Sequence, residues 1–142
     1  MKKSMLDEKG ADFLGMRLVV VLMAAFLLLS VASAYVEAYV EGASRDQARR
    51  EAFRISSLAS AEFASGIPGG SAEISVSVPG CVRHIDFTGN NYSIEFSDGS
   101  CEVHAAGCPF IPARLCPGEH RLELKVVDNG TYAVSMEAQD AR

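Results

Sequence analysis

The chain has 142 residues, of which 49% are hydrophobic and 22% charged, and its 13 Lys+Arg against 18 Asp+Glu give a net charge of -5. A nucleic-acid-binding protein needs a clustered basic face to displace counterions from phosphates, so this balance argues against that class. The apolar segments are too well patterned for a disordered chain. Four cysteines, an even number in so short a chain, are typical of a protein exported to an oxidising compartment.

Residues 18–36 form an apolar stretch without a single charge. As a helix this stretch would be about 28 Å long, close to the roughly 30 Å hydrocarbon core of a bilayer. It predicts a single membrane crossing, with the N-terminus inside and the cysteine-bearing part outside the cell. A second interpretation is a cleavable secretory signal, because Ala32, Ser33 and Ala34 form a small-x-small site after an apolar run. A cut after Ala34 would release a secreted domain that begins at Tyr35.

The helical pattern continues beyond the uncharged stretch. Apolar residues recur at three- and four-residue steps up to about residue 65, with charged residues mainly between them, which predicts an amphipathic helix. The simplest account is one continuous helix over residues 11–65, apolar all round in its first half and amphipathic in its second. A domain of this size cannot cover so long a helix, so we expect the C-terminal domain or neighbouring copies to cover its buried face.

The N-terminus resembles the class III signal peptides of archaeal type IV pilins and pilin-like proteins. The resemblance covers roughly the first 65 residues. It rests on a short polar leader, then Lys9-Gly10, a small residue at Ala11, and an apolar helix that continues as an amphipathic one. It implies that a prepilin-type peptidase cuts between Gly10 and Ala11, so that residues 1–10 are a leader. It also implies a filament in which the exposed helices of like subunits pack together. An ordinary turn before a membrane helix would also place a glycine here.

The chain after the helix has the pattern of a β-sheet. Glycines and a proline over residues 66–72 predict a hinge. Apolar and polar residues then alternate over 74–78, 85–87, 92–96, 122–126 and 132–136, which predicts five half-buried strands. We expect antiparallel hairpins with turns at Asn90-Asn91 and Asp128-Asn129-Gly130, with Gly130 at positive φ. The amphipathic half of the helix is the natural cover for the apolar face of this sheet, which makes the expected fold α+β and pilin-like, with a β domain over residues 73–142.

The cysteines lie at Cys81, Cys101, Cys108 and Cys116, with no C-x2-C pair that would favour zinc. Disulfides are the preferred interpretation. Of the three possible pairings the sequential one, Cys81 with Cys101 and Cys108 with Cys116, fits the expected hairpin and closes a loop over residues 109–115. The alternative is four reduced thiols in a cytosolic protein.

Two glycosylation sequons begin at Asn91 and Asn129, both on expected hairpin turns. Asparagine is also simply a good turn residue. A weak metal site can be imagined from His84, Asp86 and His104, but the solvated side of a sheet explains these positions better, so we expect no metal.

No nucleophile elbow, phosphate-binding loop or paired buried carboxylates can be found. We therefore expect neither an enzyme nor a cofactor. The leading hypothesis is a pilin-like structural subunit of a type IV pilus-like surface filament. It would be held in the cell membrane by one helix, with its C-terminal domain outside, and its partners would be lipid, other pilin subunits and the peptidase. The alternative is an extracellular binding module, anchored or secreted, that does not polymerise.

Overall fold

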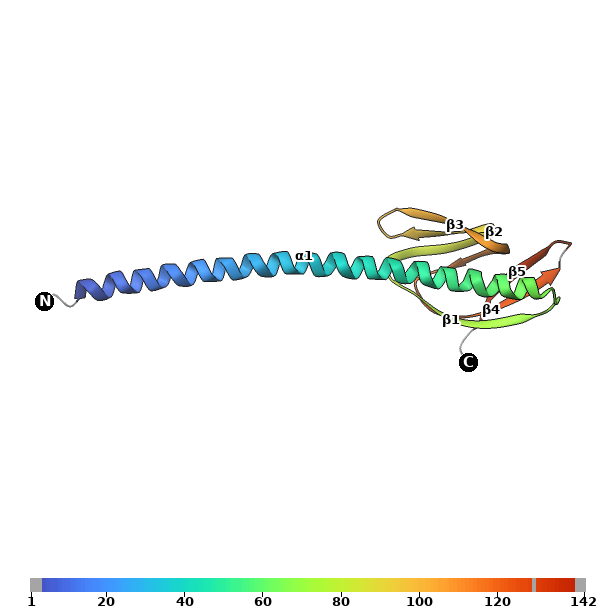
Figure 1. Ribbon diagram of the computed structural model, residues 1–142, viewed down its shortest axis with the longest axis horizontal. Coiled ribbons are helices and arrows are strands. Elements are labelled where there is room, and N and C mark those ends of the chain that lie inside the picture. Colours follow the sequence, from blue (N-terminus) through green and yellow to red (C-terminus); the bar gives the residue numbers. More distant parts are fainter. Residues whose placement is uncertain (1–3, 129, 140–142) are drawn as a thin grey trace. The chain divides into compact units, whose positions relative to one another are not determined.

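The structure, a computed structural model, describes the backbone of residues 4–128 and 130–139, and the side chains of residues 13–128 and 130–139. The chain divides into two compact units, Met1–Val40 and Glu41–Arg142. The second unit contains the end of the single helix and the whole sheet (Figure 1).

Helix α1 spans Ser4–Ser65 without interruption. The expected continuous helix is therefore present, but it begins at Ser4 rather than near residue 11. It ends at Ser65, because the next residue, Gly66, has a φ of +66°, which is not helical and is costly for any residue with a side chain. The hinge expected over residues 66–72 is shorter, because the first strand already begins at Ser71.

The five strands are β1 (Ser71–Val78), β2 (Val82–Phe96), β3 (Cys101–Leu115), β4 (Gly118–Asp128) and β5 (Tyr132–Ala138). They form one sheet in the order β1-β4-β5-β3-β2. Neighbours are antiparallel except β3 and β5, which meet in parallel at Phe110 and Val134. The expected α+β class, with a small and mostly antiparallel sheet, is confirmed.

The β4–β5 hairpin has the parity expected from the sequence, but Asp128, which was expected in the turn, is instead the last paired residue of β4. Val126 lies opposite Val134, so both apolar faces point the same way. The last pair is Asp128 with Tyr132, and Gly130 in the connection has a φ of +88°.

Strand β2 doubles back on itself at Gly89, whose φ is +57°. Its two halves lie side by side. The amide of Ser97 donates to the carbonyl of Cys81 at 2.8 Å, and the rings of Phe87 and Tyr92 lie 5.5 Å apart. The two strands expected over residues 85–87 and 92–96 are thus the two halves of β2, and they turn at Gly89 instead of Asn90-Asn91.

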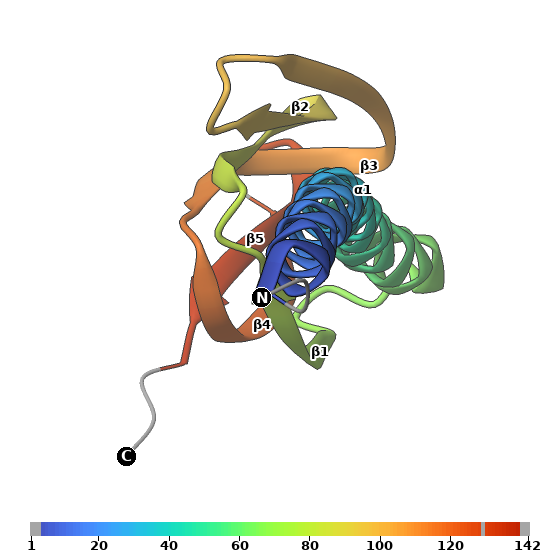
Figure 2. The ribbon, with the colours of Figure 1, turned by 90° about the vertical axis from the view of Figure 1, so that its left-hand side faces the viewer.

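Strand β3 is the element that the sequence did not predict. The segment expected to be a loop, residues 109–115, is the second half of this strand. Its two halves pair with different halves of β2, residues 101–105 with 91–95 and residues 110–115 with 85–89. Figure 2 shows the bend between them.

The core of the second unit lies between α1 and the sheet. Four small or branched side chains on one helix face, Ala48, Ala52, Ile55 and Ala59, are completely buried. They pack in one cluster with apolar residues from all five strands. The expectation that the amphipathic half of the helix covers the sheet is confirmed. Phe53 is an exception to the expected pattern, because it points away from the core and is 64% exposed.

Candidate functional site

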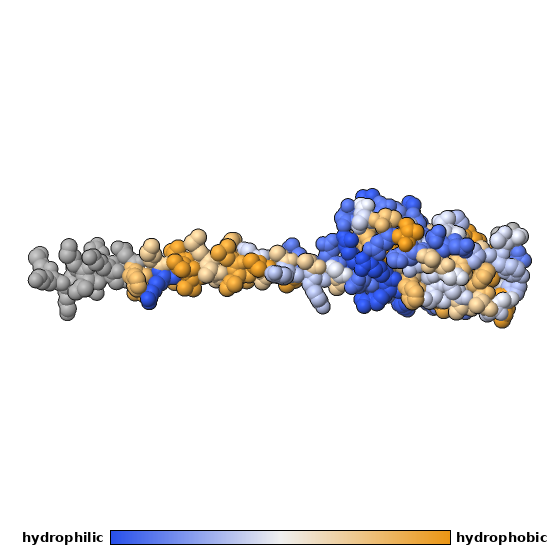
Figure 3. All heavy atoms as spheres, turned by 45° about the horizontal axis from the view of Figure 1, so that its top comes forward, coloured by the Kyte–Doolittle hydropathy of each residue, from blue (hydrophilic) through white to orange (hydrophobic). Residues whose placement is uncertain are grey.

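The most prominent feature of the first unit is the apolar segment, which we define as residues 13–40 of α1. Its large hydrophobic side chains are exposed on every side of the helix, from 54% at Val19 to 79% at Tyr39. In Figure 3 they form a nearly continuous hydrophobic surface. A helix that is apolar all round belongs in lipid or among other helices. The segment is long enough and apolar enough to cross a membrane.

Two serines inside the apolar segment, Ser30 and Ser33, find hydrogen-bond partners on their own helix. The hydroxyl of Ser30 donates to the carbonyl of Phe26 at 2.8 Å, and the hydroxyl of Ser33 donates to the carbonyl of Ser30 at 2.9 Å. In this way a serine hydroxyl in a helix makes its hydrogen bond to a backbone carbonyl of the same helix and needs no water molecule. Neither side chain therefore prevents the segment from entering an apolar phase.

Residues at both ends of the apolar segment suit the boundary between lipid and water. At the N-terminal end the guanidinium of Arg17 lies 4.4 Å from the ring centre of Phe13. At the other end Tyr35 and Tyr39 are 75% and 79% exposed and, four residues apart, share one helix face. Tyrosine is enriched where a membrane helix meets the headgroups, because its ring is apolar and its tip is polar.

In the second unit, two arginines attach α1 to the turn between β2 and β3 and to the beginning of β3. Arg49 donates to both carboxylate oxygens of Glu102 at 3.0 and 2.7 Å. Arg45 forms ion pairs with Asp98 and Glu41, and its guanidinium lies over the ring of Phe96. The sequence shows these arginines one helical turn apart, but only the structure identifies their partners on the sheet.

These contacts lower the pKa of the carboxylates that accept them. For Asp98, hydrogen bonds from the hydroxyl and the amide of Ser100, followed by the bond from Arg45, hold the pKa well below its ordinary value. For Glu102, the bond from Arg49 is the largest cause of a lowered pKa, and burial opposes it. The charged form of both groups is thus favoured by folding.

The expected processing residues Lys9, Gly10 and Ala11 lie within the helical backbone of α1. Their side chains lie outside the described residues. The backbone at Gly10 is helical, so the ordinary turn that was the alternative explanation of this glycine is not present. A helical backbone at Gly10 is evidence neither for nor against the resemblance to class III signal peptides.

All four cysteines carry free thiols, so the expected disulfides Cys81–Cys101 and Cys108–Cys116 are absent from the structure. Cys81 and Cys101 lie on opposite sides of the chain segment that contains Glu95 and Ser97. The carbonyl of Cys81 accepts from the amide of Ser97 on one side, and Cys101 pairs with Glu95 on the other. Two strand spacings, about 10 Å, separate such residues, whereas a disulfide needs its Cα atoms within about 7 Å.

Cys108 and Cys116 are kept apart because the segment between them is extended. Residues 110–115 alone span roughly 17 Å as a strand. Cys108 is buried in the core beside Ser60, and burial raises the pKa of its thiol, while Cys116 is exposed. The cysteines therefore do not support the prediction that the second unit is exported. That prediction depends on the apolar segment alone.

The other sequence-predicted positions are not brought together into a site. Asn91 is exposed, two residues after the turn at Gly89, and Asn129 lies outside the described residues. His84 contacts Asp86 and Glu95, each at 3.2 Å, whereas His104 stacks on Tyr92. Within residues 13–128 and 130–139, no group of three His, Cys, Asp or Glu side chains could hold a metal ion.

Comparisons with protein-family models, with curated proteins and with solved structures find no match to this chain. The functional argument consequently depends on the apolar segment and on the fold of the second unit.

Proposed function

We propose that this protein is a pilin-like structural subunit, held in the cell membrane by the apolar segment of α1 and able to enter a type IV pilus-like surface filament. The observation that carries the proposal is the all-round exposure of residues 13–40 in a helix that continues unbroken to Ser65. An isolated helix of this kind leaves too much apolar surface in water for a stable monomer. It needs lipid or the helices of other subunits.

The fold of the second unit supports the same proposal. One face of α1 is completely buried against the sheet, at Ala48, Ala52, Ile55 and Ala59. The apolar segment is thus left as the part available for lipid and for like subunits. Small residues such as Ala24, Ala25 and Ala32 would let helices approach closely. In this proposal a prepilin-type peptidase removes residues 1–10 between Gly10 and Ala11.

The mature N-terminus tests this proposal. The natural protein would be isolated from membranes and from sheared surface material, and its N-terminal peptide identified by mass spectrometry. A subunit processed for a filament begins at Ala11 and is found in the sheared fraction. A plain membrane anchor retains the residues before Gly10, and a secreted domain begins at Tyr35. Either of the last two results would replace the filament proposal by the anchored or secreted binding module.

A matched variant pair makes the experiment specific. Gly10→Leu places a bulky side chain at the proposed cut, and we expect it to leave the leader attached and abolish surface filaments. Gly15→Leu, five residues further along, should still be processed. Equal processing of both variants would contradict a cut at Gly10.

A further inference from the structure

Strand β1 is an edge of the sheet with little of the usual protection against pairing. It pairs with β4 over eight consecutive residues without a bulge. Its sequence, SAEISVSV, contains no proline or lysine and a single charge at Glu73. Natural edge strands are normally shortened, bulged, charged or covered. In the part of the chain that the structure describes, no segment other than β4 hydrogen-bonds to the β1 backbone.

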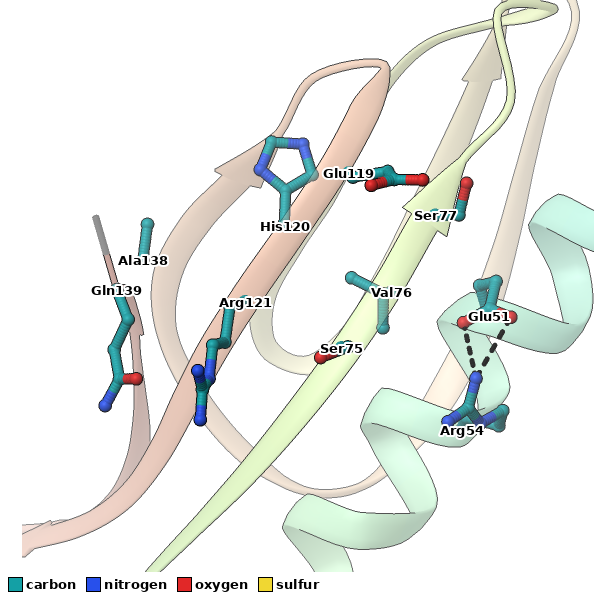
Figure 4. Close-up of a pocket in the computed structure, with 10 residues that line it drawn as sticks. All are labelled: Glu51, Arg54, Ser75, Val76, Ser77, Glu119, His120, Arg121, Ala138 and Gln139. Atoms are coloured by element: carbon teal, nitrogen blue, oxygen red, sulfur yellow. Dashed lines mark hydrogen bonds and ion pairs between the residues drawn. The ribbon is translucent and has the colours of Figure 1, made fainter. Parts of the chain in front are cut away.

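A cleft of about 720 Å³ lies beside this edge. Figure 4 shows its walls: α1 contributes Glu51 and Arg54, β1 contributes residues 75–77, and β4 contributes residues 119–121. The small side chains of Ser75 and Ser77 leave room above the strand. The volume is within the range of binding pockets in proteins, roughly 300–1,000 Å³.

The charges in the cleft favour a basic occupant. Arg54 is paired with Glu51 at 2.9 Å, and Arg121 is paired with Glu73 at 2.9 Å. Glu119, which lies opposite Ser77 on β4, forms no ion pair among the side chains that the structure describes. The one charge in the cleft that lacks a partner is therefore negative.

We propose that the free edge of β1 accepts an extended peptide strand that carries a lysine or arginine near Glu119. The peptide backbone would bond to the outward amides and carbonyls of β1, as in other cases of strand addition. Alternate side chains would enter the cleft, and the basic side chain would pair with Glu119. This binding activity goes beyond the proposed filament function and does not depend on it.

The probe for this proposal is a blocked, fluorescent peptide, Lys-Val-Ser-Val-Lys-Val-Ser-Val, titrated with the full-length protein in detergent micelles. Fluorescence anisotropy measures its dissociation constant. Two control peptides isolate the two parts of the contact. In one, both lysines are replaced by glutamate. In the other, every backbone nitrogen is methylated, which removes the hydrogen-bond donors but keeps the charge. We expect only the unmodified basic peptide to bind.

Two matched charge reversals locate the contact. Glu119→Lys should weaken binding of the basic peptide by up to about fivefold, the upper end of the range for one exposed ion pair, and favour the acidic peptide. Glu137→Lys, another exposed charge that lies on β5 outside the cleft, should leave the dissociation constant within about twofold.

Benzoylphenylalanine in place of Ser75 identifies the occupant of the edge by photocrosslinking. Crosslinks to the basic peptide support the proposal. Binding of the methylated peptide as tight as that of the unmodified one would overturn it. Equal effects of Glu119→Lys and Glu137→Lys would also overturn it, and so would crosslinks that join only two copies of the chain.

Discussion

Gly107 of β3 lies directly against Ser60 of α1. A Cβ atom added at Gly107 would be 3.1 Å from the Cβ atom of Ser60 and well inside van der Waals distance of its hydroxyl oxygen. That hydroxyl is itself held, because it donates to the carbonyl of Ser56 at 2.7 Å. Helix and strand can therefore approach this closely only while position 107 has no side chain.

This contact predicts that Gly107→Ala destabilises the second unit. Overpacking of this kind typically costs about 1–3 kcal/mol, which would appear as a lower denaturant midpoint in unfolding of the full chain in detergent. The matched control is Gly80→Ala, where an added Cβ would contact nothing within 4 Å. The double variant Ser60→Ala with Gly107→Ala should recover part of the loss. A Gly107→Ala protein as stable as the Gly80→Ala protein would contradict the tight contact.

The lowered pKa values of Glu73, Asp86, Asp98 and Glu102 predict loss of stability in acid. A carboxylate whose pKa is lower in the folded state stabilises that state above its unfolded pKa, and the contribution disappears as the pH falls through the folded pKa. The free energy of unfolding should thus be insensitive to these groups near pH 7 and fall below about pH 4.5.

Arg49→Ala provides the control for this pH dependence. The bond from Arg49 is the main cause of the lowered pKa of Glu102, so its removal should make the fall in stability between about pH 4.5 and 3 shallower. Arg50→Ala changes a neighbouring exposed arginine and should leave the slope unchanged. Identical slopes in both variants would show that Glu102 does not depend on Arg49 for its ionisation.

The free thiols predict a clear order of chemical reactivity. Cys101 and Cys116 are exposed, whereas Cys108 is 2% exposed and burial raises the pKa of its thiol. Because the thiolate is the reactive form, iodoacetamide should modify Cys101 and Cys116 in the folded protein and Cys108 only after unfolding. Peptide mass spectrometry without added reductant measures this directly. Disulfide-linked peptides containing Cys108 and Cys116 would contradict the structure.

The apolar segment predicts that one charge in its middle weakens membrane association. Leu28 is 72% exposed, and an arginine at the centre of a membrane helix costs about 2.5–3.5 kcal/mol of insertion free energy. Leu28→Arg should therefore increase the fraction of protein released from membranes by alkaline extraction. Phe53→Arg replaces an exposed hydrophobic side chain of the same helix outside the segment and should release no more than the wild type. Equal release of both variants would contradict a membrane role for residues 13–40.

The elements with a regular pattern could be predicted from the sequence. Alternation identified β1, β4 and β5, and the even parity of Val126 and Val134 identified the shared apolar face of the β4–β5 hairpin, although not the position of its turn. The steps between Ala48, Ala52, Ile55 and Ala59 identified the helix face that covers the sheet. Each of these depends on a periodicity of two or 3.6 residues, which is a local property.

The features that could not be predicted depend on contacts between distant segments. β3 contains Gly107, Pro109 and Pro112, which are all typical of loops, and it is a strand because β2 and β5 lie beside it. The expected Cys108–Cys116 bridge assumed a loop at this place, where the structure has the second half of β3 and free thiols. The partners of Arg45 and Arg49 lie about fifty residues further along the chain, and no spacing indicates them.

The doubled-back arrangement of β2 implies an order of folding. The first half of β3 pairs with the second half of β2 across the short turn at residues 97–100, and the second half of β3 pairs with the first half of β2, so both ladders join segments that are close in sequence. The β1–β4 ladder joins Ser71 to Lys125 and must close a far longer loop. Because loop closure costs more entropy as sequence separation grows, we expect the β2–β3 region to form first and β1 to join the sheet last.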